Sequence, residues 1–347
     1  MTRSCPGFAG LLPVLVLVAC FSLCFTVFSF ASQAGATILK LPKYTSVIRS
    51  MVSDSAGRLW IGSFGAGLWV VGRDRITQVT DRAGKSPSLR FSRLLLDGHL
   101  LWGATAGEGL LCYDIERNTW VPVKPDPGSR MRYLHGLARA ADGRLLLGSV
   151  GSGAASLENG VWHRFTPEQG LRDDWVNEIV PAGDSLWFAT SRGVYVIPDS
   201  GKPEWLFPQG SPAERDFWED PEVNVLVPIK PFVFIGTMSN GAFRLGPDGH
   251  ETKLKGTAGN IQAMLLWRGA LWVAGANGIW RIDHHLARPA TANKAGFWSD
   301  GCQFKSLAIS SKGTLLAGTL DGRIFETNDG KTFSLILKFS DGAFRRP

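Results

Sequence analysis

The stretch that decides the fold is RLWIGSFGAGLWVV, residues 58–71, which reads as an apolar strand, a glycine turn and a second apolar strand. Trp60 and Trp69 give the two strands bulk. Weaker copies of the stretch follow at residues 100–113, 144–157, 185–197, 232–245, 270–282 and 314–326. Successive copies start 38 to 47 residues apart. A period of this length, with several short strands in each repeat, is typical of a β-propeller.

Each repeat has room for four strands. In the first repeat we expect them at residues 46–53, 58–64, 67–71 and 76–80. Glycines, several of them after Asp or Lys, separate the strands, because tight turns need a positive φ or a side-chain turn bond. The sequence therefore predicts an all-β fold, a seven-bladed β-propeller of four-stranded antiparallel blades over residues 37–347. We expect residues 36–41 to pair with the last blade, since an open ring would leave two unpaired faces.

A family resemblance is plainest in the third to fifth repeats. FTPEQGL at residues 165–171 leads into DWVNEI at 174–179, and SLWFAT at 185–190 is followed by Gly193-Val194-Tyr195. This order resembles the two-component regulator propeller repeat. In that family the propeller often forms the external sensor half of a membrane-spanning histidine kinase, so the resemblance implies a sensor-like propeller. The sequence shows no second membrane helix, kinase domain or DNA-binding domain, and we expect a free-standing propeller that cannot signal by itself.

A second motif keeps an enzymatic alternative open. TNDGKTF, residues 327–333, is similar to the Asp-box turn of sialidase-like propellers, where it is a structural turn. A carbohydrate-active or lyase-type propeller enzyme would need paired carboxylates about 5–9 Å apart, for which Glu178 and Glu222 are the best candidates. The sequence contains no serine elbow, P-loop or dinucleotide fingerprint. We therefore expect no catalysis and no cofactor.

The N-terminal residues 1–34 predict export. Arg3 precedes an apolar stretch over residues 8–30, and small-x-small cleavage sites follow it. A cleaved signal peptide fits this pattern, but a stretch of 23 apolar or small residues would also span a bilayer as an anchor. A lipoprotein is the third interpretation, because Leu17-Val18-Ala19-Cys20 resembles a lipobox. All three place the propeller outside the cytoplasm, periplasmic or extracellular, and two of them attach it to a membrane.

Charge and cysteine content limit the partners. The net charge of +7 is spread along the chain without a Lys/Arg cluster, so we expect no nucleic-acid binding. Outside the leader, only Cys112 and Cys302 remain, in repeats two and seven, which are not ring neighbours. We expect two buried, unpaired thiols. His135 alone and the pair His284-His285 lack the partners that a zinc site requires, so we expect no metal.

The candidate binding site comes from aligning the innermost strand of each repeat. Its four-residue core falls at residues 48–51, 91–94, 134–137, 176–179, 223–226, 261–264 and 304–307. The first and fourth positions are large and apolar, whereas the second is polar in every repeat. The second-position residues are Arg49, Ser92, His135, Asn177, Asn224, Gln262 and Lys305. Sevenfold pseudo-symmetry would set these side chains at one depth near the axis, and we call them the axial ring.

We assign ligand binding to the axial ring, with Arg93 in place of its neighbour Ser92, and expect a small polar or anionic ligand. A hydrated channel without a ligand is the alternative, because channel-lining positions are polar in either case. The longest loop between blades, residues 209–221, carries Phe217 and Trp218. We expect these aromatic residues to contact a membrane or periplasmic protein. The sequence thus predicts a monomeric, extracytoplasmic binding propeller, either sensor-like or a scaffold.

Overall fold

The computed structural model describes residues 46–128, 130–165, 171, 173–198, 204–208, 222–283, 286–289 and 302–347. The predicted leader, the segment 36–41, the loop with Phe217 and Trp218, and His284-His285 lie outside the described residues. The chain divides into two units, Met1–Lys43 and Tyr44–Pro347, and every described strand belongs to the second. Within the described ranges, no helix has the length and apolar character to cross a membrane.

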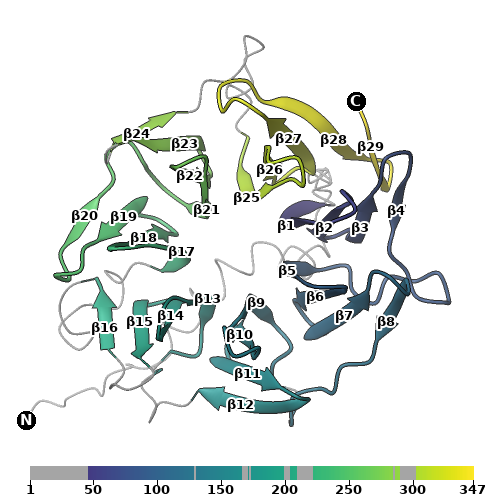
Figure 1. The fold of residues 1–347 in the computed structure, drawn as a ribbon, viewed down its shortest axis with the longest axis horizontal. Coiled ribbons are helices and arrows are strands. Elements are labelled where there is room, and N and C mark those ends of the chain that lie inside the picture. Colours follow the sequence, from purple (N-terminus) through teal and green to yellow (C-terminus); the bar gives the residue numbers. More distant parts are fainter. Residues whose placement is uncertain are drawn as a thin grey trace, which may run out of the picture. The chain divides into compact units, whose positions relative to one another are not determined.

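Seven antiparallel sheets make up the second unit, numbered here as blades one to seven in chain order (Figure 1). Blade one contains β1 (Val47–Ser53), β2 (Leu59–Phe64), β3 (Gly67–Val71) and β4 (Ile76–Gln78). Blade two contains β5 (Phe91–Asp97), β6 (Leu100–Thr105), β7 (Leu110–Asp114) and β8 (Thr119–Val121). Blade three contains β9 (Leu134–Arg139), β10 (Leu145–Ser149), β11 (Ala154–Glu158) and β12 (Val161–Phe165).

The later blades repeat this order. Blade four contains β13 (Val176–Pro181), β14 (Ser185–Thr190), β15 (Gly193–Pro198) and β16 (Glu204–Phe207), and blade five contains β17 (Val223–Ile229), β18 (Phe232–Thr237), β19 (Ala242–Leu245) and β20 (Glu251–Lys253). Blade six contains β21 (Ile261–Trp267), β22 (Ala270–Gly275), β23 (Gly278–Asp283) and β24 (Leu286–Pro289). Blade seven contains β25 (Phe304–Ile309), β26 (Leu315–Thr319), β27 (Arg323–Thr327), β28 (Ser334–Ser340) and β29 (Ala343–Arg345). The predicted seven-bladed propeller is confirmed.

The blades close into a ring through their first strands. The strands β1, β5, β9, β13, β17, β21 and β25 lie innermost, each contacts the next, and β25 contacts β1 (Figure 1). Each predicted four-residue core lies within one of these strands. Neighbouring blades meet at the starts of their inner strands, through isolated bridges between blades one to four and hydrogen bonds between blades four, five and six and between blades seven and one, so these starts lie on one face of the ring.

Apolar side chains fill the spaces between neighbouring blades. One buried cluster joins Trp60 and Leu68 of blade one to Phe91 and Leu94 of blade two, and equivalent clusters occur around the ring. A blade can bury its apolar faces only against its neighbours, which is why apolar residues predominate in the second strand of each blade. The repeated glycine of the second strand permits this close packing: a Cβ on Gly148 would lie 2.7 Å from the Val176 carbonyl oxygen.

The C-terminal strand strengthens the junction between blades seven and one. Blade seven has one strand more than the predicted four, since β29 pairs with β28. Phe344 of β29 packs edge-on against Trp69 of β3, with ring centroids 5.5 Å apart. An Arg346 Nη2 atom then donates to the carbonyl oxygens of Gly72 at 3.0 Å and Arg73 at 2.6 Å. Whether residues 36–41 also pair with this blade stays a prediction, because they lie outside the described residues.

Two local predictions are confirmed. The Asp-box forms a turn in which Oδ1 of Asp329 accepts hydrogen bonds from the backbone of Lys331 and Thr332, at 2.8 and 2.9 Å. These bonds lower the pKa of Asp329 to about 2, so the ionised carboxylate stabilises the turn. Cys112 and Cys302 are both buried, and in the described part of the chain neither forms a disulfide. Burial raises the pKa of the Cys112 thiol to about 12.

Candidate functional site

Each residue of the axial ring is the extra residue of a β-bulge. In blade one, Ile48 pairs with Ser63 and Ser50 pairs with Gly62, so Arg49 has no residue opposite it. The inner-strand register shifts at the equivalent position in the other six blades. A bulge releases one residue from the ladder and re-aims its side chain. One repeated irregularity of the backbone therefore sets all seven ring residues at the same level of the propeller.

The residues of the axial ring are less buried than the apolar residues on either side of them. The first residue of every inner-strand core is buried, and so is the fourth, except for the half-buried Leu307. In the axial ring Asn177 is buried, whereas the other six residues are half-buried. The apolar positions thus anchor the strand, and the residue between them keeps some contact with solvent.

Two side-chain contacts skip a blade and so show that these side chains point toward the axis. Nη1 of Arg49 in blade one donates to Oε1 of Gln262 in blade six at 3.5 Å, past blade seven. Nη2 of Arg93 in blade two lies 2.6 Å from Oε1 of Glu178 in blade four, past blade three. The third position of blade three is Gly136, whose Cβ would lie 3.2 Å from the Glu178 Cα. A side chain at this position would therefore crowd the backbone of blade four next to this ion pair.

Asn177 and Asn224 join neighbouring blades. The Nδ2 atom of each donates at 2.9 Å to the carbonyl oxygen of the first core residue of the next blade, Val223 or Ile261. The same Nδ2 atoms also donate at 3.1 Å to residues that precede the next inner strand, Glu222 and Asn260 respectively. These amides therefore have a structural role between blades.

The third core position supplies further bonds between blades. Ser306 Oγ of blade seven donates to the Ile48 carbonyl of blade one at 2.9 Å, and Ser50 Oγ of blade one accepts from Leu94 N of blade two at 3.0 Å. Glu178 Oε2 accepts from Leu226 N of blade five at 2.7 Å. Where a bulge interrupts regular pairing, side chains of the adjacent blade satisfy the backbone groups.

Besides burial, the Arg49 charge lowers the pKa of two other residues of the ring, His135 and Lys305. Burial and the Arg49 charge lower the pKa of His135 to about 4, with a smaller contribution from Arg93 and against a hydrogen bond to Asn177. Burial and the Arg49 charge also lower the pKa of Lys305 to about 8. His135 is therefore neutral at pH 7, and Lys305 is still mostly charged. Arg49 acts on residues from blades three and seven, which again places its side chain near the axis.

The two candidate catalytic carboxylates have different environments. Glu178 is held by Arg93 and the Leu226 amide, whereas Glu222 accepts from Asn177. Burial raises the pKa of Glu222, and the neighbouring Asp173 charge adds to the increase. Each carboxylate is thus engaged in contacts between blades. Among the described residues, no group of three or more His, Cys, Asp and Glu side chains could hold a metal ion.

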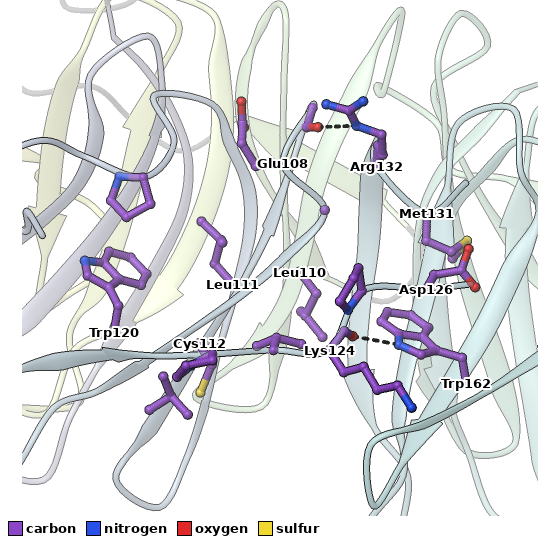
Figure 2. Close-up of a pocket in the computed structure, with 17 residues that line it drawn as sticks. Glu108, Leu110, Leu111, Cys112, Trp120, Lys124, Asp126, Met131, Arg132 and Trp162 are labelled. Atoms are coloured by element: carbon purple, nitrogen blue, oxygen red, sulfur yellow. Dashed lines mark hydrogen bonds between the residues drawn. The ribbon is translucent and has the colours of Figure 1, made fainter. Parts of the chain in front are cut away.

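Two cavities lie between neighbouring blades. One, of about 310 Å³, lies between blades two and three, with Trp120 of β8 on one side and Trp162 of β12 on the other (Figure 2). Leu110 and Leu111 of β7 lie between the two indoles, and Trp162 Nε1 donates to the Lys124 carbonyl at 2.9 Å. A second cavity, of about 400 Å³, lies between blades four and five. Neither cavity is lined by a residue of the axial ring.

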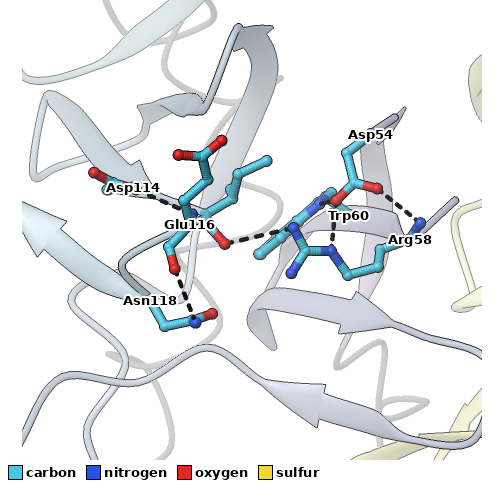
Figure 3. A network of polar contacts seen from close by, with 7 residues as sticks. Asp54, Arg58, Trp60, Asp114, Glu116 and Asn118 are labelled. Carbon is cyan, nitrogen blue, oxygen red and sulfur yellow. Dashed lines mark hydrogen bonds and ion pairs between the residues drawn. The ribbon is translucent and has the colours of Figure 1, made fainter. Parts of the chain in front are cut away.

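A polar network on the opposite face joins blade one to blade two (Figure 3). Asp54 follows β1, and its carboxylate accepts from Trp60 Nε1 at 2.9 Å and from Arg58 N and Nε at 2.8 and 2.6 Å. An Arg58 Nη2 atom reaches the Ile115 carbonyl of blade two at 3.4 Å. On this face the buried Asp54 carboxylate orients Arg58, which contacts blade two. The axial ring lies near the other face.

The structure brings part of the predicted site together. Arg49 interacts with Gln262 and His135 of non-adjacent blades and with Lys305 on the neighbouring strand, while Arg93 pairs with Glu178. Sequence reasoning missed Asn260, whose Oδ1 accepts from both Asn224 and Gln262. Asn260 directly precedes the four-residue core of its inner strand, as Trp175 and Glu222 do in blades four and five. The aligned cores began one residue later and so did not include this position.

The comparisons with known proteins agree with the repeat type and the fold. Residues 45–65, which include β1 and β2, match the family model described as two component regulator propeller, so the expected repeat is confirmed. No curated protein matches the chain significantly.

Solved structures similar to the chain include two extracellular domains from B. thetaiotaomicron. One is described as part of the one component system BT4673 (20% identity, TM-score 0.66, covering 86% of this chain and 39% of that one). The other is described as part of the hybrid two component system BT3049 (15% identity, TM-score 0.66, covering 87% of this chain and 47% of that one). The chain thus spans less than half the length of either regulator structure.

An enzyme shares the fold as well. A catalytically inactive virginiamycin B lyase from Staphylococcus aureus, bound to quinupristin, is 15% identical with a TM-score of 0.59, and the match covers 84% of this chain and 94% of the lyase. At these identities the three likenesses show a shared propeller fold, and function has to be argued from the residues.

Proposed function

We propose that this chain, which carries the two component regulator propeller repeat, is an extracytoplasmic, sensor-like binding module whose ligand contacts the axial ring. The observation that carries the proposal is the contact of Arg49 with Gln262 past an intervening blade. Convergent polar side chains at the centre of a ring form a ready ligand site, because several blades contribute donors to one small space. The similarity to extracellular domains of regulators supports the sensor-like assignment.

A thermal-shift screen of the full chain against sugars, organic anions and inorganic anions tests this proposal. A ligand of the ring raises the melting temperature of the native chain, because it binds only the folded state. We expect the increase to shrink in Arg49→Gln, His135→Gln and Lys305→Gln. A ligand whose effect is unchanged in all three variants would bind elsewhere and contradict the proposal.

Export is tested separately. Cell fractionation locates the chain, and the intact mass of the purified protein distinguishes a leader cleaved near residue 34 from a retained one. We expect the chain outside the cytoplasm in either case. A soluble cytoplasmic chain of full mass would contradict the extracytoplasmic assignment.

The alternative is a carbohydrate-active or lyase-type enzyme. It is favoured by the raised pKa of Glu222, since a raised pKa favours the protonated form that a general acid needs. Glu222→Gln would then abolish turnover of any ligand found in the screen while leaving its binding intact. We expect instead that a ligand of the ring is recovered unchanged.

A further inference from the structure

We infer that the ligand of the axial ring is a small oxyanion held between Arg49 and Lys305. The inference rests on the proposed function and names the ligand class for the same site. Three features carry it: the register of two neighbouring strands, the fixed position of the Arg49 guanidinium, and the engagement of nearby carboxylates with other partners.

The register places Arg49 and Lys305 at one level. They are the bulge residues of β1 and β25, which are adjacent at the ring junction. The hydrogen bond from Ser306 Oγ to the Ile48 carbonyl, 2.9 Å long, ties the residue after Lys305 to the residue before Arg49. Two long cationic side chains therefore leave neighbouring strands side by side.

The Arg49 guanidinium is held in place before any ligand arrives. Gln262 Oε1 accepts from its Nη1 atom, and Gln262 is in turn held through its Nε2 atom by Asn260. The guanidinium carbon lies 5.9 Å from the centroid of the Phe64 ring. Gln262 is thus a positioning residue. A fixed, planar guanidinium beside a flexible ammonium suits the oxygens of phosphate, sulfate or a compact carboxylate.

Charge distribution favours an anion over a neutral ligand. Glu178 and Glu222 enter from blades four and five, and both already have partners, the first in Arg93 and the Leu226 amide, the second in Asn177. Arg49 acts on Lys305 as a like charge. An anion seated between these two cations offsets their repulsion with two attractions, which a neutral sugar cannot do.

Anion binding should take up protons near pH 8. The strands packed against β25 are chiefly β1, β21, β22 and β26, and Arg49 is the one charged or titratable residue within those four strands. The Lys305 pKa of about 8 leaves the amine half protonated at that pH. A bound anion favours the ammonium form and raises this pKa, so binding takes up as much as about half a proton per anion at pH 8.

The experiment is isothermal titration calorimetry of the full chain at pH 8 with sodium phosphate and sodium sulfate, and with glucose as a neutral probe. Each titration is run in two buffers of different ionisation enthalpy. The ring variants are Arg49→Gln and Lys305→Gln. The matched controls are Arg82→Gln and Lys312→Gln, exposed residues outside the inner strands that change the net charge equally. Circular dichroism verifies that every variant is folded.

We expect at least one oxyanion to bind with buffer-dependent heat, at least about tenfold more weakly in each ring variant and unchanged in both controls. If Arg49→Gln does not fold, Lys305→Gln and the buffer dependence decide the question. Anion binding that all variants retain would overturn the inference, and so would an absence of anion binding. A neutral ligand lost in the ring variants would overturn it while leaving the proposed function intact. Failure of every probe here and of the thermal-shift screen would contradict both.

Discussion

Asp54 illustrates how much one buried residue contributes to the face opposite the axial ring. Burial opposes its charge, but hydrogen bonds from Trp60 and Arg58 outweigh that effect, and the pKa of Asp54 lies below its ordinary value. Asp54→Ala leaves the buried Trp60 indole and the Arg58 guanidinium without their acceptor. We expect the free energy of unfolding at pH 7 to fall by about 2–3 kcal/mol, measured by urea denaturation.

Asp142 provides a matched control for Asp54. It occupies the same turn in blade three and binds Arg144 through N at 3.0 Å and Nε at 2.7 Å, but it is exposed. Asp142→Ala should change stability much less, because water replaces an exposed pair at little cost. Equal losses in the two variants would show that the Asp54 network contributes no more than a surface ion pair.

His135 makes stability depend on pH in a specific window. Its pKa is lowered to about 4 by burial and by Arg49 and Arg93, whereas an unfolded histidine titrates near 6.5. Between these values the unfolded chain binds a proton that the folded chain excludes. The contribution of His135 is therefore fully favourable above about pH 6.5 and is lost as the pH falls, by at most about 1.4 kcal/mol per pH unit.

Urea denaturation from pH 4 to pH 7 measures this effect. Subtracting the stability of His135→Gln from that of the native chain isolates the contribution of His135, since Glu178, Glu222 and the other acids are common to both. His163→Gln is the control, because His163 is exposed on β12. A difference curve that is flat below pH 6.5 would mean that His135 is protonated in the folded protein as easily as in water.

Among the elements, β29 contributes to the junction between blades seven and one. Phe344 is 3% exposed and packs on Trp69 and on Phe339, with centroids 5.5 and 5.1 Å apart. We expect Phe344→Ala to lower the free energy of unfolding by about 3 kcal/mol, because it leaves a cavity between blades seven and one. Thermal and urea denaturation measure the change.

Arg345 is the control for this strand. Its side chain is exposed on β29, so Arg345→Ala should leave the free energy of unfolding within about 0.5 kcal/mol of the native value. If Phe344→Ala were as stable as Arg345→Ala, β29 would contribute nothing to stability, and ring closure would depend on the inner strands alone.

The inner strands show where sequence reasoning succeeds and where it stops. Large residues such as Ile48 and Phe91 recur at fixed offsets, so the strand cores and the polar position between them were predictable from the pattern. The bulge was not predictable, because a register shift depends on how the inner strand pairs with the second strand, and no particular residue type marks it in the sequence. Nor was the bonding of Asn177 to Val223, which needs two blades in place.

At the scale of the whole molecule, closure should make unfolding cooperative. Each apolar cluster is shared by two blades, so no blade can lose its packing without exposing its neighbour. We expect tryptophan fluorescence and far-ultraviolet circular dichroism to give coincident urea transitions for the propeller. Phe344→Ala should shift both transitions together. Transitions that separate in the native chain would show blades unfolding independently.

The architecture as a whole was readable from the sequence, because the 38 to 47 residue repeat of RLWIGSFGAGLWVV and its copies is a property of the chain itself. Contacts across the axis were not. The bond between Arg49 and Gln262 spans 213 residues of sequence and exists only once seven blades have met. The fifth strand of blade seven was missed for a related reason: Ala343–Arg345 is too short to show a strand period.

The seven bulges have a consequence for how such a centre can vary. A residue that has no partner across the ladder can be exchanged for another without costing its sheet a hydrogen bond. Outside blades four and five, where Asn177 and Asn224 also bond to the next blade, each blade thus offers one position where chemistry and scaffold are uncoupled, and recognition can be rewritten blade by blade. Chains of this architecture could then share every strand and still prefer unrelated molecules at their hub.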